Sequence, residues 1–532
     1  MINFSVNNKM KVVIVTIVFT MIVFLYPFLT SIFYDADISS LWMDSSLGIK
    51  HALYNTCMFS FVSSCINTIG GLQLSILIRN VSTKTKVGVA LSILLLPVIL
   101  GNVTISYIYK TSLYGSVFGG YIIGSGGLMQ MVIFVFIHFW QYGLLFTYLF
   151  WLIIRQIPAS RYDYSSSLQM TEKEIVRDIV LPPLRSLFVL LFLINMMFSF
   201  YESAKCQFVF KTSQGMDSEF ISQALYRIYQ LYSVINPVMA KTVTMKNGIV
   251  LAILLVIILV CCVKIIISLF SCFRKSVPLL LYSSKCGNKV AFVCIILVLI
   301  PIIIAFSKSR YALSLVSFSQ MPMTFLLTIV SAMFATGIAV IFGIATRMLL
   351  GRKITESNRR VVSLFLPVFL LQLIPPICIM VCGYYWLGII GYNDIVTYLV
   401  WIWGHPLLVF PILSSFVIAT HFVVGNDELE WNMVHKLNSR DIIKFSFLKR
   451  FRKEYALTFL FAFAFIWNDV TLNKILSDEI PSFAEKMQRL FIGRATNDEQ
   501  ATLYAIFAIL MAIASIMLWN NVMKGERYSK FK

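Results

Sequence analysis

The sequence predicts an all-α integral membrane protein with about 12 transmembrane helices, arranged as two pseudo-twofold-related halves of about six helices each. Of its 532 residues, 59% are hydrophobic and only 13% are charged, roughly half the charged share of a soluble domain. The mean hydropathy is +0.83. A water-soluble core could not bury so much apolar surface, so the composition excludes a soluble fold.

Apolar runs long enough to cross a ~30 Å hydrocarbon core, which takes about 20 helical residues, recur along the whole chain. The first half has spans near 12–33, 53–78, 87–109, 128–153, 184–203 and 248–270. The second half has spans near 289–307, 323–346, 361–385, 394–422, 455–470 and 500–520. No small-residue cleavage site follows the first span, which therefore resembles an uncleaved signal anchor.

Lysine and arginine residues set the expected orientation. The chain has 44 of them against 24 acidic residues, a net charge of +20. Most lie in segments that are cytosolic if both termini are cytosolic, notably 153–185 and 423–453. The excess charge therefore reflects topology and contact with lipid headgroups, and it does not indicate a nucleic-acid partner.

The cysteines give no sign of a metal site. There are 10, and none are paired at metal-ligand spacing. Cys261, Cys262, Cys378 and Cys382 lie inside apolar runs, where cysteine behaves as a small hydrophobic residue. We expect neither a metal nor another cofactor.

Internal repetition divides the chain into a first half at 1–270, a cytosolic linker at 271–288 and a second half at 289–532. In each half the longest cytosolic loop separates the fourth and fifth spans. The third span of each half also contains proline, at Pro97 in one and at Pro375 and Pro376 in the other. Proline removes a backbone hydrogen bond, so we expect a kink there.

The two long loops contain similar short amphipathic stretches, each with a polar break after a leucine. The first loop contributes Asp163, Leu168, Gln169, Ile179, Leu181 and Pro182. The second contributes Leu437, Asn438, Ile442, Phe445 and Leu448. Such helices are too short to span a membrane, so we expect them on the cytosolic surface, offering a face to a partner. Recurrence in both halves disfavours simple connecting helices.

This pattern resembles the permease subunit of bacterial binding-protein-dependent ABC importers. That family's loop has a Glu-Ala-Ala start, a glycine and a later Leu-Pro. Here the corresponding segments are Asp163 to Gln169, followed by Ile179-Val-Leu181-Pro182. The family glycine is replaced by Gln169 in one half and by Asn438 in the other. Asparagine tolerates a left-handed turn better than glutamine does. Arg450-Phe451 replaces the second Leu-Pro.

Two permease halves in one chain resemble ferric-iron and thiamine importers, with phosphonate and polyamine systems as relatives. The resemblance implies location in the bacterial inner membrane. It also implies that each loop docks on a cytosolic ATP-binding subunit, expected in two copies, and that a periplasmic solute-binding protein delivers the solute. The chain itself lacks Gly-x-x-x-x-Gly-Lys-Ser/Thr. It is therefore expected to be a transport subunit and not an enzyme.

Four titratable residues at membrane depth are candidates for the translocation pathway. Glu202 and Asp469 follow the two loop leucines at nearly equal distances along the chain. His138 and His405 precede the same leucines, again at nearly equal distances. An acidic pair and a histidine pair would suit a cationic solute. The alternative is that all four are helix end-caps or satisfied hydrogen bonds between helices.

Two other protein classes remain open. A twelve-helix secondary transporter would place its longest cytosolic loop between the two halves, whereas here the longest loops fall within each half. A membrane-embedded enzyme or assembly factor would need polar residues clustered within spans, and these are sparse. The importer permease remains the favoured interpretation.

Overall fold

The structure, a computed structural model, describes most but not all of the chain. The described residues are 49–81, 85–114, 127–155, 157, 159–201, 221–275, 287–308, 321–350, 376–391, 393–421, 443–449, 451–469 and 498–524.

Every regular element among these residues is a helix. Seven helices are long and apolar enough to cross a membrane, and an eighth span results if the bent pair Glu172–Arg185 and Leu187–Phe200 counts as one. The chain is therefore an all-α multi-pass membrane protein. A total of about twelve spans stays a prediction, because 12–33 and most of 361–385 lie outside the described residues.

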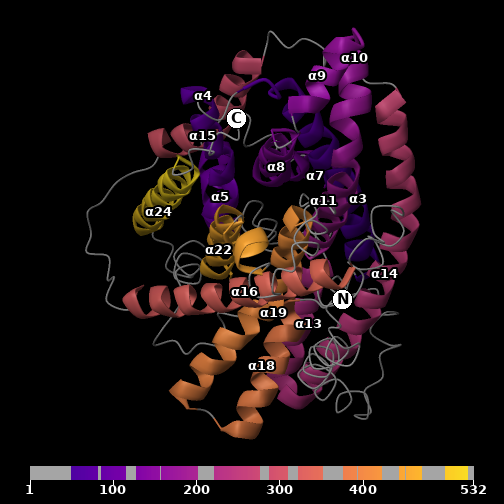
Figure 1. The fold of residues 1–532 in the computed structure, drawn as a ribbon. Helices are drawn as coiled ribbons and strands as arrows, with labels where there is room; N and C mark the ends of the chain where they lie inside the picture. Colours follow the sequence, from indigo (N-terminus) through magenta and orange to yellow (C-terminus); the bar gives the residue numbers. More distant parts are fainter. Residues whose placement is uncertain are drawn as a thin grey trace. The chain divides into compact units, whose positions relative to one another are not determined.

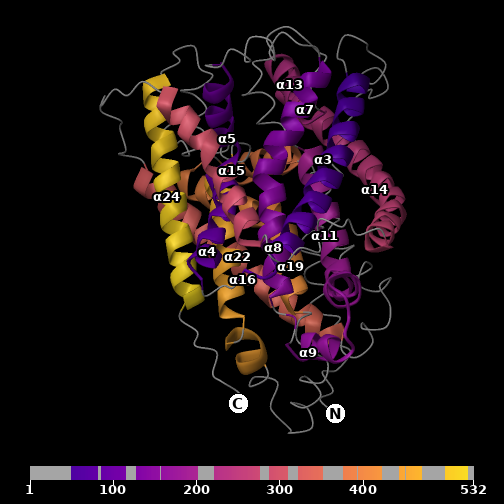
Figure 2. The ribbon, with the colours of Figure 1, turned by 90° about the horizontal axis from the view of Figure 1, so that it is seen from above.

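One compact unit comprises residues 51–221, 256–319 and 483–532. In it, α15 and α24 lie alongside α5 (Figure 1 and Figure 2). Its elements are α3 (Ile49–Leu77), α4 (Lys86–Ala90), the 3-10 turn η2 (Leu91–Leu95), α5 (Leu96–Tyr114), α7 (Gly127–His138), the π-helical turn η3 (Phe139–Gly143), α8 (Leu144–Ile154), α9 (Ala159–Ser167), α10 (Glu172–Glu174), the π-helical turn η4 (Ile175–Val180), α11 (Leu181–Phe200), α15 (Gly287–Lys308) and α24 (Asp498–Lys524).

The other compact unit comprises residues 1–50, 222–255 and 320–482. Within it, α16 packs against α19 and α22, and α18 packs against α19 (Figure 1). Its elements are α13 (Ile221–Ile235), the first part of α14 (Pro237–Lys275), α16 (Met321–Leu350), α18 (Pro376–Ile390), α19 (Asp394–His421), the π-helical turn η9 (Ile443–Lys449) and α22 (Arg452–Trp467).

The compact units combine segments from both ends of the sequence. Helices α15 and α24, which come from the second half of the sequence, belong to the same unit as α3 to α11. Asn520 of α24 donates a hydrogen bond to Ser92 Oγ at 2.8 Å, and Thr502 is hydrogen-bonded to Tyr107 of α5. The division at 271–288 describes the predicted sequence repeat, and that repeat stays a prediction.

Prolines inside helices leave backbone carbonyls without a helical N–H donor, and side chains from neighbouring helices donate hydrogen bonds to them. Pro301 has no N–H to offer the carbonyl of Leu297, four residues earlier, and Trp140 Nε1 donates to that carbonyl at 2.9 Å. Pro406 likewise frees the carbonyl of Ile402, which accepts from Ser331 Oγ at 3.2 Å. Each interruption thus becomes a contact between helices.

Helix α5 is kinked at Gly101, four residues after Pro97. The 3-10 turn η2 ends at Leu95, directly before α5, and the N–H of Leu96 donates to the carbonyl of Ile93, which Pro97 cannot serve. Gly101 adopts φ 71 and ψ 167, outside the helical region, and glycine reaches this conformation without a Cβ clash. The kink shown in this span is therefore at Gly101, and a separate kink at Pro97 stays a prediction. In the second half, α18 begins at Pro376, and residues 361–375 lie outside the described part.

Candidate functional site

The first long loop folds into a helix, a left-handed turn and a second helix. Helix α9 ends at Ser167, and Gln169 has φ 52, the one positive value among the described non-glycine residues. The N–H of Gln169 donates to Ser166 O at 3.1 Å, and that of Met170 donates to Ser165 O at 3.0 Å. This pair of bonds is a Schellman motif, whose left-handed position usually holds glycine. Gln169 therefore occupies a left-handed position that ordinarily favours glycine.

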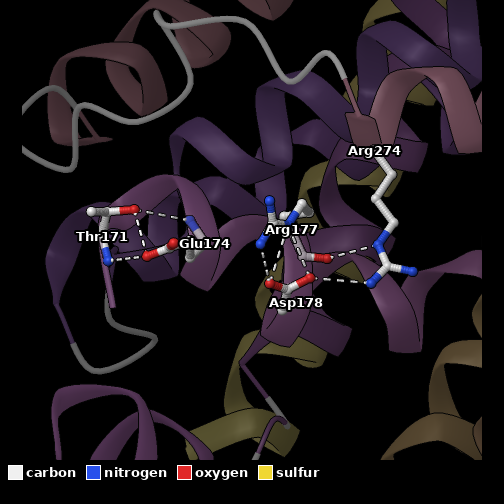
Figure 3. Close-up of polar contacts among 5 residues, drawn as sticks. All are labelled: Thr171, Glu174, Arg177, Asp178 and Arg274. Carbon is white, nitrogen blue, oxygen red and sulfur yellow. Dashed lines mark hydrogen bonds and ion pairs between the residues drawn. The ribbon is translucent and has the colours of Figure 1, made fainter. Parts of the chain in front are cut away.

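A capping box starts the next helix immediately after this turn. Thr171 Oγ1 accepts from the N–H of Glu174, while the Glu174 carboxylate accepts from the N–H of Thr171 at 2.8 Å (Figure 3). The bond from the Thr171 backbone, assisted by the Thr171 hydroxyl, lowers the pKa of Glu174. The sequence pattern Thr-x-x-Glu therefore fixes where the chain leaves the turn.

Asp178 ties the loop to the end of α14. Arg177 Nη2 donates to Asp178 Oδ2 at 2.7 Å, and Arg274 Nη2 donates to Oδ1 at 3.2 Å (Figure 3). Arg274 Nε also donates to the carbonyl of Arg177 at 3.0 Å. The hydrogen bond from Arg177, followed by that from Arg274, lowers the pKa of Asp178. The loop is thus held by a residue 96 positions away in the sequence.

Arg79, which follows α3, forms a second anchor of the loop through an ion pair with Glu172. Its side chain is only 4% exposed, and Nη2 donates to Glu172 Oε2 at 2.6 Å. Nη1 donates to the carbonyl of Ile76 at 3.0 Å. Burial raises the pKa of Tyr162 on α9, while Arg79 and Arg155 act in the opposite direction. The arginine therefore anchors the segment that follows the left-handed turn.

These anchors leave one face of the loop exposed. Leu168 is 55% exposed although it is apolar, and Asp163 and Gln169 beside it are exposed as well. Ile179 and Leu181 are buried, whereas Pro182 is exposed. The predicted loop residues therefore divide into an exposed tip around Leu168 and a buried base at the start of α11.

The second loop is described only at its end. Leu437 and Asn438 lie outside the described residues, and Phe445 lies in η9 without a described side chain. Leu448 is 45% exposed, and Phe447 is fully buried. A π-helical turn thus leads into α22 just as η4 leads into α11. Val180 of η4 is fully buried like Phe447 of η9.

The two candidate histidines stand in matching places in the sequence. His138 is as far from His405 along the chain as Glu202 is from Asp469, and as Val180 is from Phe447. Both histidines are fully buried, and each precedes a helix irregularity, the π-helical turn η3 in one case and Pro406 in the other. Irregular helix turns expose backbone groups and are frequent at functional sites. Glu202 lies outside the described residues.

His138 lies in a buried network of neutral polar side chains. Ser199 Oγ lies 2.8 Å from His138 Nε2 and accepts from Ser63 Oγ at 3.0 Å. Asn195 Nδ2 donates to Ser64 Oγ at 3.0 Å, and Asn67 donates to Asn195 Oδ1 at 3.2 Å. These bonds join α3, α7 and α11.

His405 lies beside an acid instead. Its Nδ1 donates to the carbonyl of Trp401 at 3.0 Å, and its Nε2 lies 3.3 Å from Asp469 Oδ2. Asp469 follows the end of α22 and is 10% exposed. The structure therefore brings His405 and Asp469 together, and it places His138 in a network that includes no charged group among the contacts described above.

Sequence reasoning missed most of the partners that hold these sites. Ser60, Ser63, Ser64 and Asn67 recur at helical spacing within an apolar run, a polar stripe that periodicity could have revealed. Thr171 and Glu174 match the capping-box pattern and could also have been found. Nothing in the sequence indicates the contact of Arg274 with Asp178. Among the described residues, no group of three or more His, Cys, Asp or Glu side chains could hold a metal ion.

Comparison with known proteins identifies no relative. No protein-family profile matches the chain, and neither curated proteins nor solved structures yield a match.

Proposed function

We propose that the chain is the membrane-spanning permease subunit of an ATP-binding-cassette importer. A separate cytosolic ATP-binding subunit, in two copies, would supply the energy, and a periplasmic binding protein would deliver a small solute such as ferric iron, thiamine, a phosphonate or a polyamine. The protein would lie in the bacterial inner membrane with both termini in the cytosol.

The observation that carries this proposal is the structure of the first long loop. Its left-handed turn lies at Gln169, the position at which the resembled family has glycine, and a capping box and the buried Leu181 follow it. Arg79 and Arg274 anchor the loop, while the apolar side chain of Leu168 stays exposed. A rigidly held apolar tip is suited to a cleft in a partner subunit. The turn η9 before α22 supports a second, related contact.

Coupling would pass from these loops into the spans that follow them. Helix α11 continues from η4, and α22 follows η9. Asn195 and Ser199 on α11 contact helices α3 and α7, while Asp469, at the end of α22, contacts α19. A displacement of either loop would therefore act on a buried polar site. We assign Glu202, His138, His405 and Asp469 to the translocation pathway under this proposal.

Charge placed on the exposed tips tests the proposal. Leu168→Asp and Leu448→Asp change side chains that are 55% and 45% exposed, so folding and membrane insertion should persist. We expect each variant to lose co-purifying ATPase, with the larger loss for Leu168→Asp. Val234→Asp, at a position 87% exposed and outside both loops, is the matched control and should retain it. Full retention of the ATPase by both loop variants would overturn the proposed docking surface.

A further inference from the structure

Two arginines meet where two apolar spans end. The spans that contain α3 and α8 are long and apolar enough to cross a membrane, and they end at Leu77 and Ile154. Arg79 and Arg155 follow directly after these ends. Arg155 Nη1 donates to the carbonyl of Arg79 at 3.5 Å, so the two arginines lie at the same end of the two spans. In a membrane they would lie at the level of the lipid headgroups.

The acidic residues beside this pair balance only one of its two charges. Arg79 Nη2 donates to Glu172 Oε2 at 2.6 Å, which forms an ion pair. Arg155 is exposed, and it forms no ion pair with a carboxylate in the part of the chain that the structure describes. Asp163 is the acidic residue of α9, and it is exposed as well. The charge of Arg155 is therefore available to an external anion.

The other polar groups around Arg155 can also donate hydrogen bonds. Tyr162 of α9 is close to both arginines, because their charges act to lower the pKa of its phenol against the larger effect of burial. Trp151, one helical turn before Arg155, is 1% exposed, and its indole N–H has no hydrogen-bond partner among the described residues. Guanidinium and indole N–H groups donate and cannot accept, so a ligand at this place must be an acceptor.

We propose that Arg155, with Arg79 and Tyr162 beside it, binds the phosphate of an anionic phospholipid headgroup. A phosphodiester carries one negative charge, and its oxygens accept parallel hydrogen bonds from a planar guanidinium. Basic sites between the ends of membrane helices are suited to such headgroups. A zwitterionic headgroup would also bring a cation toward the arginines, so a net negative headgroup such as phosphatidylglycerol fits better.

A headgroup at this site would lie next to an anchor of the first long loop. Arg79, whose carbonyl accepts from Arg155, is also the residue that holds Glu172. Lipid bound at Arg155 would therefore stabilise the ends of α3 and α8 from which α9 and the left-handed turn follow. The inference concerns the surrounding membrane, so it goes beyond the proposed function and does not depend on it.

Native mass spectrometry of the full chain tests the site, with phosphatidylglycerol and phosphatidylethanolamine of identical acyl chains as the ligands. We expect the wild-type chain to bind phosphatidylglycerol more tightly than phosphatidylethanolamine. Arg155→Gln should weaken the binding of phosphatidylglycerol about tenfold, the effect of losing one charge-assisted hydrogen bond. Arg155→Lys keeps the charge but loses the planar fork, so its affinity should be intermediate.

Lys264→Gln is the matched control, because it removes one positive charge from an exposed position on α14. It should bind phosphatidylglycerol as the wild-type chain does. Equal affinities of Arg155→Gln and Lys264→Gln would overturn the proposal. Equal binding of the two lipids by the wild-type chain would also overturn it, since Arg155 would then only complement the C-terminal end of α8.

Thermal unfolding of the wild-type chain in detergent gives a second readout if Arg155→Gln does not accumulate. Added phosphatidylglycerol should raise the unfolding midpoint, and phosphatidylethanolamine should raise it less. Inorganic phosphate at the same concentration should leave the midpoint unchanged. An equal rise with inorganic phosphate would overturn the assignment to a lipid, and no rise with phosphatidylglycerol would overturn the site itself.

Discussion

His138 and His405 occupy matching places in the sequence, but the helices around them are held together by different forces. Ser63, Ser199 and Asn195 surround the first with neutral hydrogen bonds. At the places in the second half that match Asn195 and Ser199, the chain has the buried apolar residues Ala462 and Ile466. In that half an ion-pair distance between His405 and Asp469 takes the place of the network.

The two buried histidines thus make contacts of different kinds, His138 with a neutral hydroxyl and His405 at ion-pair distance from a carboxylate. The same spacing along the chain therefore supports two kinds of helix contact, and each should respond to a different perturbation.

The largest expected effect is the loss of the neutral network in the first half. Asn195→Ala removes a buried amide that bonds Ser64 and Asn67, and both lose a partner. We expect the free energy of unfolding to fall by about 2 kcal/mol. Thermal unfolding in detergent measures it.

Thr68→Val is the matched control, because the Thr68 hydroxyl donates to Ser64 O within its own helix. Its effect should be much smaller. Equal losses for the two variants would mean that the bonds between helices contribute little, and the contrast between the halves would then lose its energetic basis.

The next largest effect concerns the anchor of the first loop. Arg79→Gln removes a guanidinium that is almost fully buried and bonded to Glu172. Because Glu172 is half exposed, we expect a loss of only about 1 kcal/mol. Hydrogen exchange of residues 169–181 should increase, while exchange in η9 stays unchanged. An equal increase in both segments would indicate general destabilisation.

A smaller effect of opposite sign is expected at the left-handed turn. Gln169→Gly relieves the steric cost of φ 52 and should stabilise the loop by about 0.5 kcal/mol. Unfolding midpoints of Gln169→Gly and the wild-type chain provide the comparison, and a lower midpoint for the variant would contradict the prediction.

The smallest expected effect is a loss of stability at acid pH, and it is confined to the first loop. Hydrogen bonds lower the pKa values of Asp178 and Glu174 in the folded chain. Their contribution is therefore fully present above the unfolded-state values and is lost as the pH falls through the lowered folded-state values. Exchange of residues 171–181 should rise at acid pH. Asp178→Asn should remove most of this dependence, and an unaltered dependence would exclude Asp178 as its source.

Local patterns in the sequence predicted what depends on near neighbours. Hydropathy predicted a helical membrane protein. The polar residues after Leu168 predicted a break at the turn in which Gln169 has a positive φ. The Thr-x-x-Glu pattern of the capping box at Thr171 is local as well and could have been recognised, although it was not predicted.

Contacts that depend on which helices become neighbours could not be predicted in this way. Apolar runs look alike, so nothing indicated that α15 and α24 would pack against α5. The bonds of Trp140 to Leu297 and of Arg274 to Asp178 join residues far apart in the chain. The positions of His405 and Asp469 along the chain match those of His138 and Glu202, and the sequence predicted this match. Their direct contact is seen only in the structure.

Affinity purification of the tagged, full-length chain tests the central claim most directly. Mass spectrometry of the co-purifying proteins would identify any ATPase, and its ratio to the chain would count the docking loops in use. We predict a stoichiometric ATPase at about two copies per chain, because each half presents one loop. A chain that purifies alone and still transports in liposomes under an ion gradient would contradict the importer assignment and identify a secondary transporter.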